Sequence, residues 1–415
     1  NADPLDGGSE AVAPEGIRSE MHHTYSNDNG DRSDVLDSTL ATVRRILAGL
    51  DVANVTEDAV IAAPSFYDGP VLLKDRGHFN HFAGQLAVNL RFVGYSFEEV
   101  AFLTVRQLSE MYVRDSFPPV PSVPLSDEQY ELSFPRTSLD QADSRKDFPI
   151  SFLLGAPRSG TTLLRAMLNL HTSLWAPGEL HLANFATMAD RARQVGAILR
   201  YMPIPEVASR CGESVTEFSK TFRGWELAAA PVADVYQRLH DADPGVMIVD
   251  KSPPYCTRLE TLERIGEQFP NSTFVHLVRS PHDVIRSYVR MQFHRVHGGL
   301  FNPGRNPYHM GEAIWFACNA NTETFLGSIP ANRKCVIRFE DLTSGPAGSL
   351  RTICRLLERE FQPRMADPYA TPGAVAVGAG DLHVNLLKRV ERRTPSAPFY
   401  QLGSRCQELA TRFGY

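Results

Sequence analysis

Four short apolar runs, separated by long amphipathic stretches, constrain the fold of the chain from Phe148 to Tyr415 more than any other feature. These runs are Ile150–Leu154, Val246–Val249, Thr273–Val278 and Lys334–Phe339. Strand candidates that alternate with helix candidates are typical of a parallel sheet whose two faces are covered by helices. We therefore expect an α/β fold over this part of the chain.

The first apolar run leads into a glycine-containing turn and then into a helix that we expect to begin near Thr161. Such a turn directs backbone N–H groups and the positive end of the helix at one point, where a phosphate binds. The spacing of Gly155 and Gly160 matches the G-x-x-x-x-G-K-[ST] loop of nucleotide triphosphatases, with Thr161 in place of the lysine. Arg158 supplies positive charge earlier in the loop, so the sheet is predicted to be P-loop-like. The predicted phosphate-binding residues are Pro157, Arg158, Ser159, Gly160, Thr161 and Thr162.

The missing lysine argues against phosphoryl transfer from Mg-ATP. A sulfuryl group carries less charge, and it is transferred without a metal when fixed cationic and hydroxyl donors hold the leaving phosphate. The segment Pro157–Leu163 resembles the 5′-phosphosulfate loop of sulfotransferases that use 3′-phosphoadenosine 5′-phosphosulfate (PAPS). With Arg158 in the loop, followed by Arg165–Leu168 and His171, it is most similar to the tyrosylprotein and bacterial branches of that family.

A second segment, Phe269–Tyr288, is similar to the 3′-phosphate segment of the same family. The resemblance implies that Arg279 and Ser287 bind the 3′-phosphate of the donor. A guanidinium offers a planar fork suited to phosphate oxygens, and a serine adds one hydroxyl. Read by itself, Arg279 is equally well a solvent-exposed residue at the end of a strand.

Lys251 follows the strand candidate Val246–Val249 in the sequence Asp-Lys-Ser-Pro-Pro. Active sites of open α/β sheets lie at the carboxyl ends of the strands, which places Lys251 well. It resembles the Lys-[ST]-Pro of many sulfotransferases, where it would hold the sulfuryl oxygens or stabilise the leaving phosphate. The alternative is a surface lysine before a turn.

The acceptor hydroxyl must lose a proton, so a general base is required. Glu179 is our first choice, because it falls where relatives place an acidic residue after the helix of the phosphate loop. The tyrosylprotein branch has two successive acids where this chain has Gly-Glu-Leu. His181 is therefore a rival, since a neutral imidazole also accepts a proton.

The part of the chain before Phe148 is expected to hold three segments. Residues 1–33 form a flexible acidic tail, 34–113 a small all-helical domain, 114–147 a proline-rich linker, and 148–415 the sulfotransferase domain. The helical pattern weakly resembles an acyl carrier protein. Where a carrier has the serine that takes phosphopantetheine, this chain has Asn80–Phe82, so such a domain would not be loaded. The alternative is an unrelated helical cap.

Charge and hydropathy exclude several classes of protein. The net charge is −6, but residues 1–38 carry −7, so the remainder is nearly neutral and no nucleic-acid partner is expected. No apolar stretch approaches the 20 or so residues of a membrane helix, and no membrane partner or secretory signal is expected. Six scattered cysteines without a C-x-x-C pair favour reduced thiols and a cytoplasmic location. The chain begins at Asn1, and we expect it to be part of something longer.

These features predict a PAPS-dependent sulfotransferase that uses PAPS as co-substrate and no metal. The acceptor would be a hydroxyl on a small molecule or on an acyl chain tethered to a carrier protein, as in sulfotransferase domains of some polyketide synthases. A tyrosine or phenol acceptor is the first alternative. A nucleotide kinase or a non-catalytic nucleotide-binding scaffold is the second.

Overall fold

The computed structural model of the chain describes residues 32–48, 55–56, 59, 61, 72–73, 103–132, 145–195, 200–201, 203–297, 300–301, 304–371 and 389–415. The chain divides into two compact units, Asn1–Pro118 with Arg290–Val296, and Pro119–Val289 with His297–Tyr415. In neither unit does a described helix combine the length and apolarity needed to cross a membrane.

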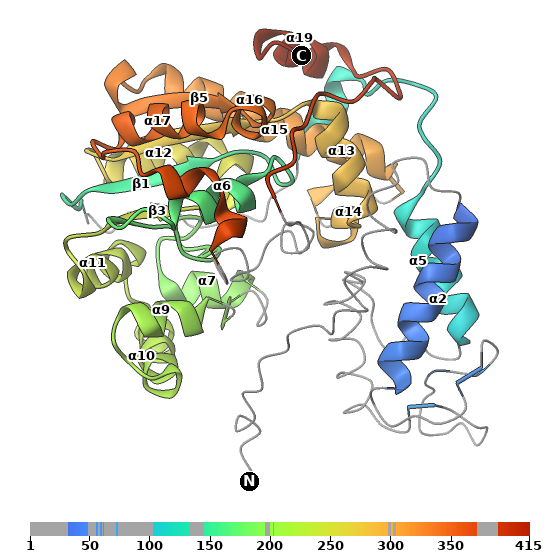
Figure 1. Ribbon diagram of the computed structural model, residues 1–415, viewed down its shortest axis with the longest axis horizontal. Coiled ribbons are helices and arrows are strands. Elements are labelled where there is room, and N and C mark those ends of the chain that lie inside the picture. The colour runs from blue at the N-terminus through green and yellow to red at the C-terminus, as the bar shows by residue number, and fades with distance from the viewer. Residues whose placement is uncertain are drawn as a thin grey trace. The chain divides into compact units, whose positions relative to one another are not determined.

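The first unit contains helices α2 (Arg32–Ala48) and α5 (Val105–Ser116), which pack against each other (Figure 1). Leucine and valine side chains spaced along one face of each helix form a small core. A capping box begins α5, because the side chains of Thr104 and Gln107 each accept a hydrogen bond from the other residue's backbone N–H, at 3.2 and 2.9 Å.

Residues Arg290–Val296, far along the sequence, belong to this first unit. The buried Gln292 donates from Nε2 to the Tyr112 carbonyl and to Ser116 Oγ, at 3.1 and 2.9 Å, and Arg295 pairs with Asp115 at 3.2 Å. The unit therefore includes a segment that no local pattern near residues 34–113 indicates. The predicted acidic tail up to residue 31 and the carrier-like position Asn80–Phe82 lie outside the described residues, and the domain limits remain predictions.

The second unit contains a parallel sheet of five strands in the order β2-β3-β1-β4-β5. The strands are β1 (Ile150–Leu154), β2 (Leu174–Trp175), β3 (Met247–Asp250), β4 (Thr273–Val278) and β5 (Lys334–Arg338). The predicted α/β class and parallel sheet are confirmed, and all four predicted strands are present within one residue of their expected ends. Strand β2 was not predicted, because two residues are too few for an apolar run.

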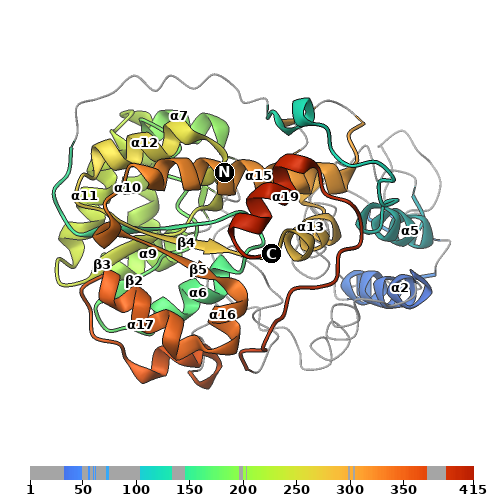
Figure 2. The ribbon, with the colours of Figure 1, turned by 90° about the horizontal axis from the view of Figure 1, so that it is seen from above.

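Helices cover both faces of this sheet, as Figure 2 shows. On one face lie α6 (Thr161–Leu168), α16 (Phe339–Ser344) and α17 (Pro346–Leu356), and on the other lie α11 (Val232–Ala242), α12 (Leu259–Gln268) and α15 (Pro307–Gly327). The remaining described helices are α7 (Met188–Gln194), α9 (Ile204–Arg210), α10 (Val215–Leu227), α13 (Pro281–Arg290), α14 (Phe293–Val296) and α19 (Ser404–Arg412). Short 3₁₀ turns are η1 (Asp127–Tyr130), η2 (Pro253–Thr257), η4 (Ala331–Arg333), η5 (Pro363–Ala366) and η6 (Pro368–Ala370).

Neighbouring residues of β1 pack into two different hydrophobic cores, because successive side chains of a strand point to opposite faces of the sheet. Leu153 packs in an aliphatic cluster with residues of α6 and α17. On the opposite face, the Phe152 ring stacks with that of Phe274 and packs at a tilt against that of Phe269, at centroid distances of 6.0 and 5.6 Å. With both faces buried, β1 is fixed at the centre of the sheet, and its carboxyl end is fixed with it.

Two distant segments of the second unit meet at the buried Glu312 of α15. Its carboxylate accepts hydrogen bonds from the Tyr130 hydroxyl, from the Tyr400 hydroxyl at 2.8 Å and from the Gly403 N–H at 2.8 Å. The proline-rich stretch that ends in η1 and the segment before α19 are thereby both fastened to α15.

Gly160→Ala should lower the free energy of unfolding. Gly160 has φ +93°, a left-handed conformation that costs an L-residue about 1–2 kcal/mol, and an added Cβ would also meet the Phe339 ring. Urea denaturation should show a loss of at least about 1 kcal/mol. The matched control is Gly224→Ala in α10, where nothing lies within 4 Å, and where alanine should stabilise the helix by up to about 1 kcal/mol. Equal stability of Gly160→Ala and the wild type would show that the turn accepts a side chain at this position.

Candidate active site

The sequence motifs converge at the carboxyl edge of the sheet. The phosphate loop follows β1, Lys251 follows β3, and Arg279 follows β4. Because β1 pairs with both β3 and β4, these three segments are neighbours although they are far apart in the chain.

The loop after β1 has the backbone of an anion-binding turn. Arg158 and Gly160 both have positive φ, +72° and +93°, and α6 begins directly after them at Thr161. The N-cap residue of α6 is Gly160, which has no side chain to cap the helix. The Ser159 side chain is buried, and among the described residues its Oγ has no hydrogen-bond partner.

The second motif contacts this loop directly. Arg158 Nε donates to Ser287 Oγ at 3.0 Å, and Arg279 donates from a terminal nitrogen to the Arg158 carbonyl at 3.2 Å. The Arg279 guanidinium also lies over the Phe339 ring, 4.6 Å from its centroid. Burial lowers the pKa of Arg279. The structure thus brings together two motifs that sequence reasoning had joined only by resemblance.

The two predicted phosphate segments contain buried polar atoms suited to binding an anion. Buried polar groups are normally hydrogen-bonded, yet Ser159 Oγ and Arg279 Nε are buried without a partner in the described part of the chain. Both are donors, and both belong to the predicted phosphate segments. Each predicted phosphate segment therefore keeps one buried donor without a partner among the described residues.

Glu179, His181 and Lys251 also lie together. Lys251 Nζ is 2.5 Å from Glu179 Oε1, and His181 Nε2 is 3.4 Å from Glu179 Oε2. The lysine side chain is only 1% exposed and the glutamate side chain 18%, so the ion pair is largely withdrawn from water. The two base candidates and the catalytic lysine candidate thus form one cluster.

The electrostatics of this cluster favour a charged glutamate. Burial by itself raises the pKa of a carboxyl, but the Lys251 ammonium and the neighbouring His181 outweigh it and bring the pKa of Glu179 to about 2. Burial lowers the pKa of Lys251, and Glu179 opposes that shift. Glu179 is therefore a carboxylate at neutral pH and accepts a proton readily only if its partner is drawn away.

A second ion pair fixes the segment before Glu179. Arg165 of α6 donates to both carboxylate oxygens of Glu206 in α9, at 3.0 and 2.9 Å, and to the Pro177 carbonyl at 2.8 Å. Glu206 also accepts from the Gly178 N–H at 2.9 Å. Sequence reasoning gave Glu206 no role, because nothing near it in the sequence signals the contact.

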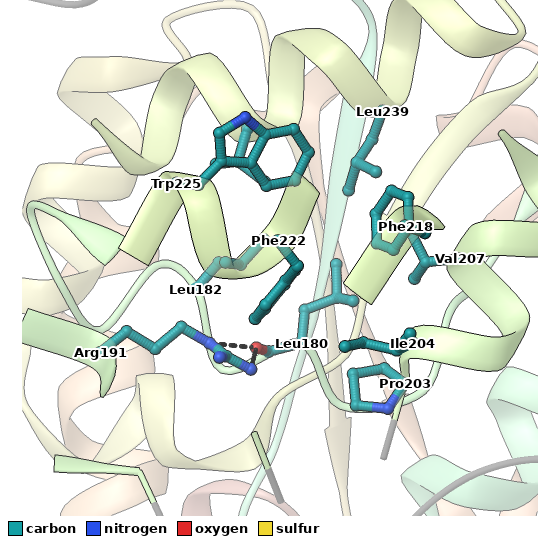
Figure 3. Close-up of a pocket in the computed structure, with 11 residues that line it drawn as sticks. Leu180, Leu182, Arg191, Pro203, Ile204, Val207, Phe218, Phe222, Trp225 and Leu239 are labelled. Atoms are coloured by element: carbon teal, nitrogen blue, oxygen red, sulfur yellow. Dashed lines mark hydrogen bonds between the residues drawn. The ribbon is translucent and has the colours of Figure 1, made fainter. Parts of the chain in front are cut away.

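The side chains of Leu180 and Leu182, which alternate with Glu179 and His181 along the chain, face an apolar pocket (Figure 3). Leu180 and Leu182 line it together with residues of α9, α10 and α11, including Phe218 and Phe222. Arg191 reaches in from α7 and donates twice to the Leu180 carbonyl, at 2.9 and 2.8 Å. Arg191, like Glu206, was not predicted from the sequence.

The comparisons with known proteins agree with the motifs. The sulfotransferase family profile matches residues 149–363, which is more than half of the chain. The chain belongs to the sulfotransferase family. The match extends from the start of β1 to the first residue of η5 and includes every candidate site residue.

Two solved structures resemble this sulfotransferase. A sulfotransferase domain from the curacin biosynthetic pathway is 32% identical, with a TM-score of 0.59, and the match covers 66% of this chain and 99% of that one. A sulfotransferase domain from the Synechococcus PCC 7002 olefin synthase is 28% identical, with a TM-score of 0.59, and the match covers 68% and 99% of the two chains. The fold of the matched part of the chain is therefore similar to that of these two sulfotransferase domains.

The curated relatives are matched over less of their length. Protein-tyrosine sulfotransferase 1 of Danio rerio is 25% identical over 216 residues, 51% of this chain and 54% of the relative. An uncharacterized protein of Aquifex aeolicus is 32% identical over 151 residues, 36% of this chain and 18% of the relative. The chain thus spans about half or less of the curated relatives it matches.

Glu179→Gln should destabilise the fold, because it leaves the Lys251 ammonium buried without its counter-charge. Breaking a buried ion pair from one side typically costs about 3–5 kcal/mol. Urea denaturation should show a loss in this range. The double variant Glu179→Gln with Lys251→Met, which removes both charges, should recover most of it. A single variant as stable as the wild type would show that the pair is not withdrawn from water.

Proposed function

We propose that this sulfotransferase takes its sulfuryl group from PAPS and transfers it to an acceptor hydroxyl. The observation that carries the proposal is the contact between the two phosphate motifs, with Arg158 bonded to Ser287 at 3.0 Å and Arg279 bonded to the Arg158 carbonyl at 3.2 Å. A donor with phosphates at both ends of a nucleoside would bridge them. PAPS supplies an activated sulfuryl group on its 5′ side and a 3′-phosphate for recognition.

The residues of the phosphate loop would hold the 5′ side of the donor. The backbone N–H groups of Gly160 and Thr161 and the Ser159 and Thr162 hydroxyls donate to phosphate oxygens, and Pro157 shapes the turn. Arg279 and Ser287 would hold the 3′-phosphate. Arg158 and Lys251 supply the positive charge that stabilises the leaving phosphate. No metal is part of the proposal.

Glu179 is proposed as the general base. As the acceptor oxygen bonds to sulfur and the sulfur–phosphate oxygen bond breaks, the acceptor proton passes to Glu179. Lys251, now 2.5 Å from Glu179, is drawn toward the negative charge that develops on the leaving phosphate. The carboxylate then loses its main counter-charge while it stays buried, which raises its proton affinity at the moment of transfer. His181 would assist from the other carboxylate oxygen, and it remains the rival base.

A hydroxyl on a carrier-tethered acyl chain or on a related specialised metabolite is the proposed acceptor class. The similarity to sulfotransferase domains from a biosynthetic pathway and from an olefin synthase supports it, and an acyl carrier protein would be the partner. A tyrosine or phenol acceptor is the second candidate, supported by the likeness to the Danio rerio enzyme. A kinase would need the loop lysine that Thr161 replaces, and a scaffold would bind the donor without turnover.

Arg279→Ala tests the donor assignment. It should weaken the binding of 3′,5′-ADP, the desulfated donor, by about 1.5–3 kcal/mol, because a charge-assisted hydrogen bond to the 3′-phosphate is lost. Binding of 5′-AMP should barely change, since this nucleotide has no 3′-phosphate. Calorimetry measures both, and Arg333→Ala, which removes the same charge before β5, is the control. Equal losses for the two nucleotides would reject the assignment.

The pH dependence of kcat/KM tests the base. Glu179 in the free enzyme has its pKa lowered to about 2, so its carboxylate persists as the pH falls and is lost only near that value. With Glu179 as base, no acid limb should appear between pH 5 and 8, and Glu179→Gln should lose activity on the order of 10²–10⁴-fold. An acid limb within the histidine range, together with a larger loss in His181→Ala, would reverse the two roles.

A further inference from the structure

The loop that carries Glu179 and His181 is held by its backbone as well as by its side chains. The His181 N–H donates to Ser252 Oγ at 3.1 Å. The N–H groups of Leu182 and Ala183 both donate to the Tyr255 hydroxyl, at 3.1 and 3.2 Å. Two hydroxyls that follow β3 thus accept three consecutive amides of the loop.

Both hydroxyls donate their own protons to one carboxylate. Ser252 Oγ lies 3.3 Å from Asp250 Oδ1, and the Tyr255 hydroxyl lies 2.7 Å from Oδ2. Asp250 is fully buried at the end of β3, and it also accepts from the Tyr236 hydroxyl of α11. We call Asp250, Ser252 and Tyr255 the Asp250 cluster, because Ser252 and Tyr255 also bond to the loop and Tyr236 does not.

The chemistry of a hydroxyl gives this arrangement a direction. A hydroxyl has one proton to donate and two lone pairs. Because the hydroxyls of Ser252 and Tyr255 donate their protons to the Asp250 carboxylate, only their oxygen lone pairs remain to accept hydrogen bonds from the loop amides. The lone pairs of Tyr255 then accept from Leu182 and Ala183, while the Tyr236 hydroxyl, 3.3 Å from that of Tyr255, donates its own proton to Asp250. The Asp250 carboxylate therefore orients both hydroxyls so that they accept hydrogen bonds from the loop.

The loop itself needs such support. His181 has φ +49°, a left-handed conformation that a non-glycine residue adopts rarely. Conformations of this kind persist only where the surroundings hold them, and they are frequent at active sites. Its amide is held by Ser252, and the carbonyl before it is held by Arg191.

We propose that the Asp250 cluster positions the general base, acting through Ser252 and Tyr255 on the backbone of residues 181–183. The proposal rests on the function proposed above. Asp250, Ser252 and Tyr255 are positioning residues, since none of them need touch donor or acceptor. They make the spacing between Glu179, His181 and Lys251 a property of the fold rather than of bound substrate.

Tyr255→Phe and Tyr236→Phe form a matched pair for testing this proposal. Each removes one buried hydroxyl from the same Asp250 oxygen, but only Tyr255 bonds to the loop. Hydrogen exchange of the free protein should show that Leu182 and Ala183 lose protection at least tenfold in Tyr255→Phe and keep it in Tyr236→Phe. This measurement needs no substrate.

Turnover with PAPS gives the second readout, on whichever acceptor of an acyl-carrier, peptide and phenol panel is sulfated. Tyr255→Phe should lower kcat on the order of 10²-fold, the effect of a small misplacement of reacting groups, with the KM for PAPS within twofold of the wild type. Tyr236→Phe should stay close to the wild type. If Tyr255→Phe does not fold, Ser252→Ala, which frees only the His181 amide, takes its place.

Two results would overturn the proposed positioning role, and a third would instead reject the proposed sulfotransferase function. Unchanged protection of residues 181–183 in Tyr255→Phe, or equal kcat losses in both tyrosine variants of an active protein, would reject the positioning role alone. A wild type that transfers no sulfuryl group to any acceptor would reject the proposed function, and with it the catalytic meaning of the cluster.

Discussion

The pairing of β1 with both β3 and β4 is the constraint on which the site depends. Parallel pairing puts the carboxyl ends of these strands at one edge of the sheet, so the phosphate loop, Lys251 and Arg279 meet there without any sequence proximity. The pairing is secured by burial on both faces, with Phe152 in an aromatic core and Leu153 in an aliphatic one. A slip of one residue would exchange these faces and remove the site.

Buried charge is the second organising feature. A largely buried lysine and glutamate are tolerable only as a pair, since an isolated charge is costly to withdraw from water. The same pairing holds the pKa of Glu179 near 2, so Glu179 is a poor base until the Lys251 ammonium pairs with another anion. The proposed mechanism uses this link, because the leaving phosphate is that anion. The proton affinity of Glu179 then rises as negative charge develops on the leaving phosphate.

Much of the fold and part of the site could be predicted from the sequence, for identifiable reasons. Strands such as Ile150–Leu154 are continuous apolar runs, and the phosphate loop has fixed glycine spacing, so both are visible locally. β2 has only two residues and was missed. Tyr255 and Glu206 act through contacts with residues about 30 to 70 positions away, which only the folded chain brings together. For the same reason, no pattern indicated that Arg290–Val296 belongs to the first unit.

The central claim is transfer of a sulfuryl group from PAPS, and product analysis tests it most directly. The protein would be incubated with PAPS and EDTA in separate reactions with an acyl-carrier, a peptide and a phenol acceptor. The mass of each acceptor would then be measured by mass spectrometry. We expect that one acceptor class gains the mass of a sulfuryl group, that 3′,5′-ADP is released in equal amount, and that EDTA leaves the yield unchanged. Transfer of a phosphoryl group, or a strict requirement for Mg²⁺, would contradict the claim.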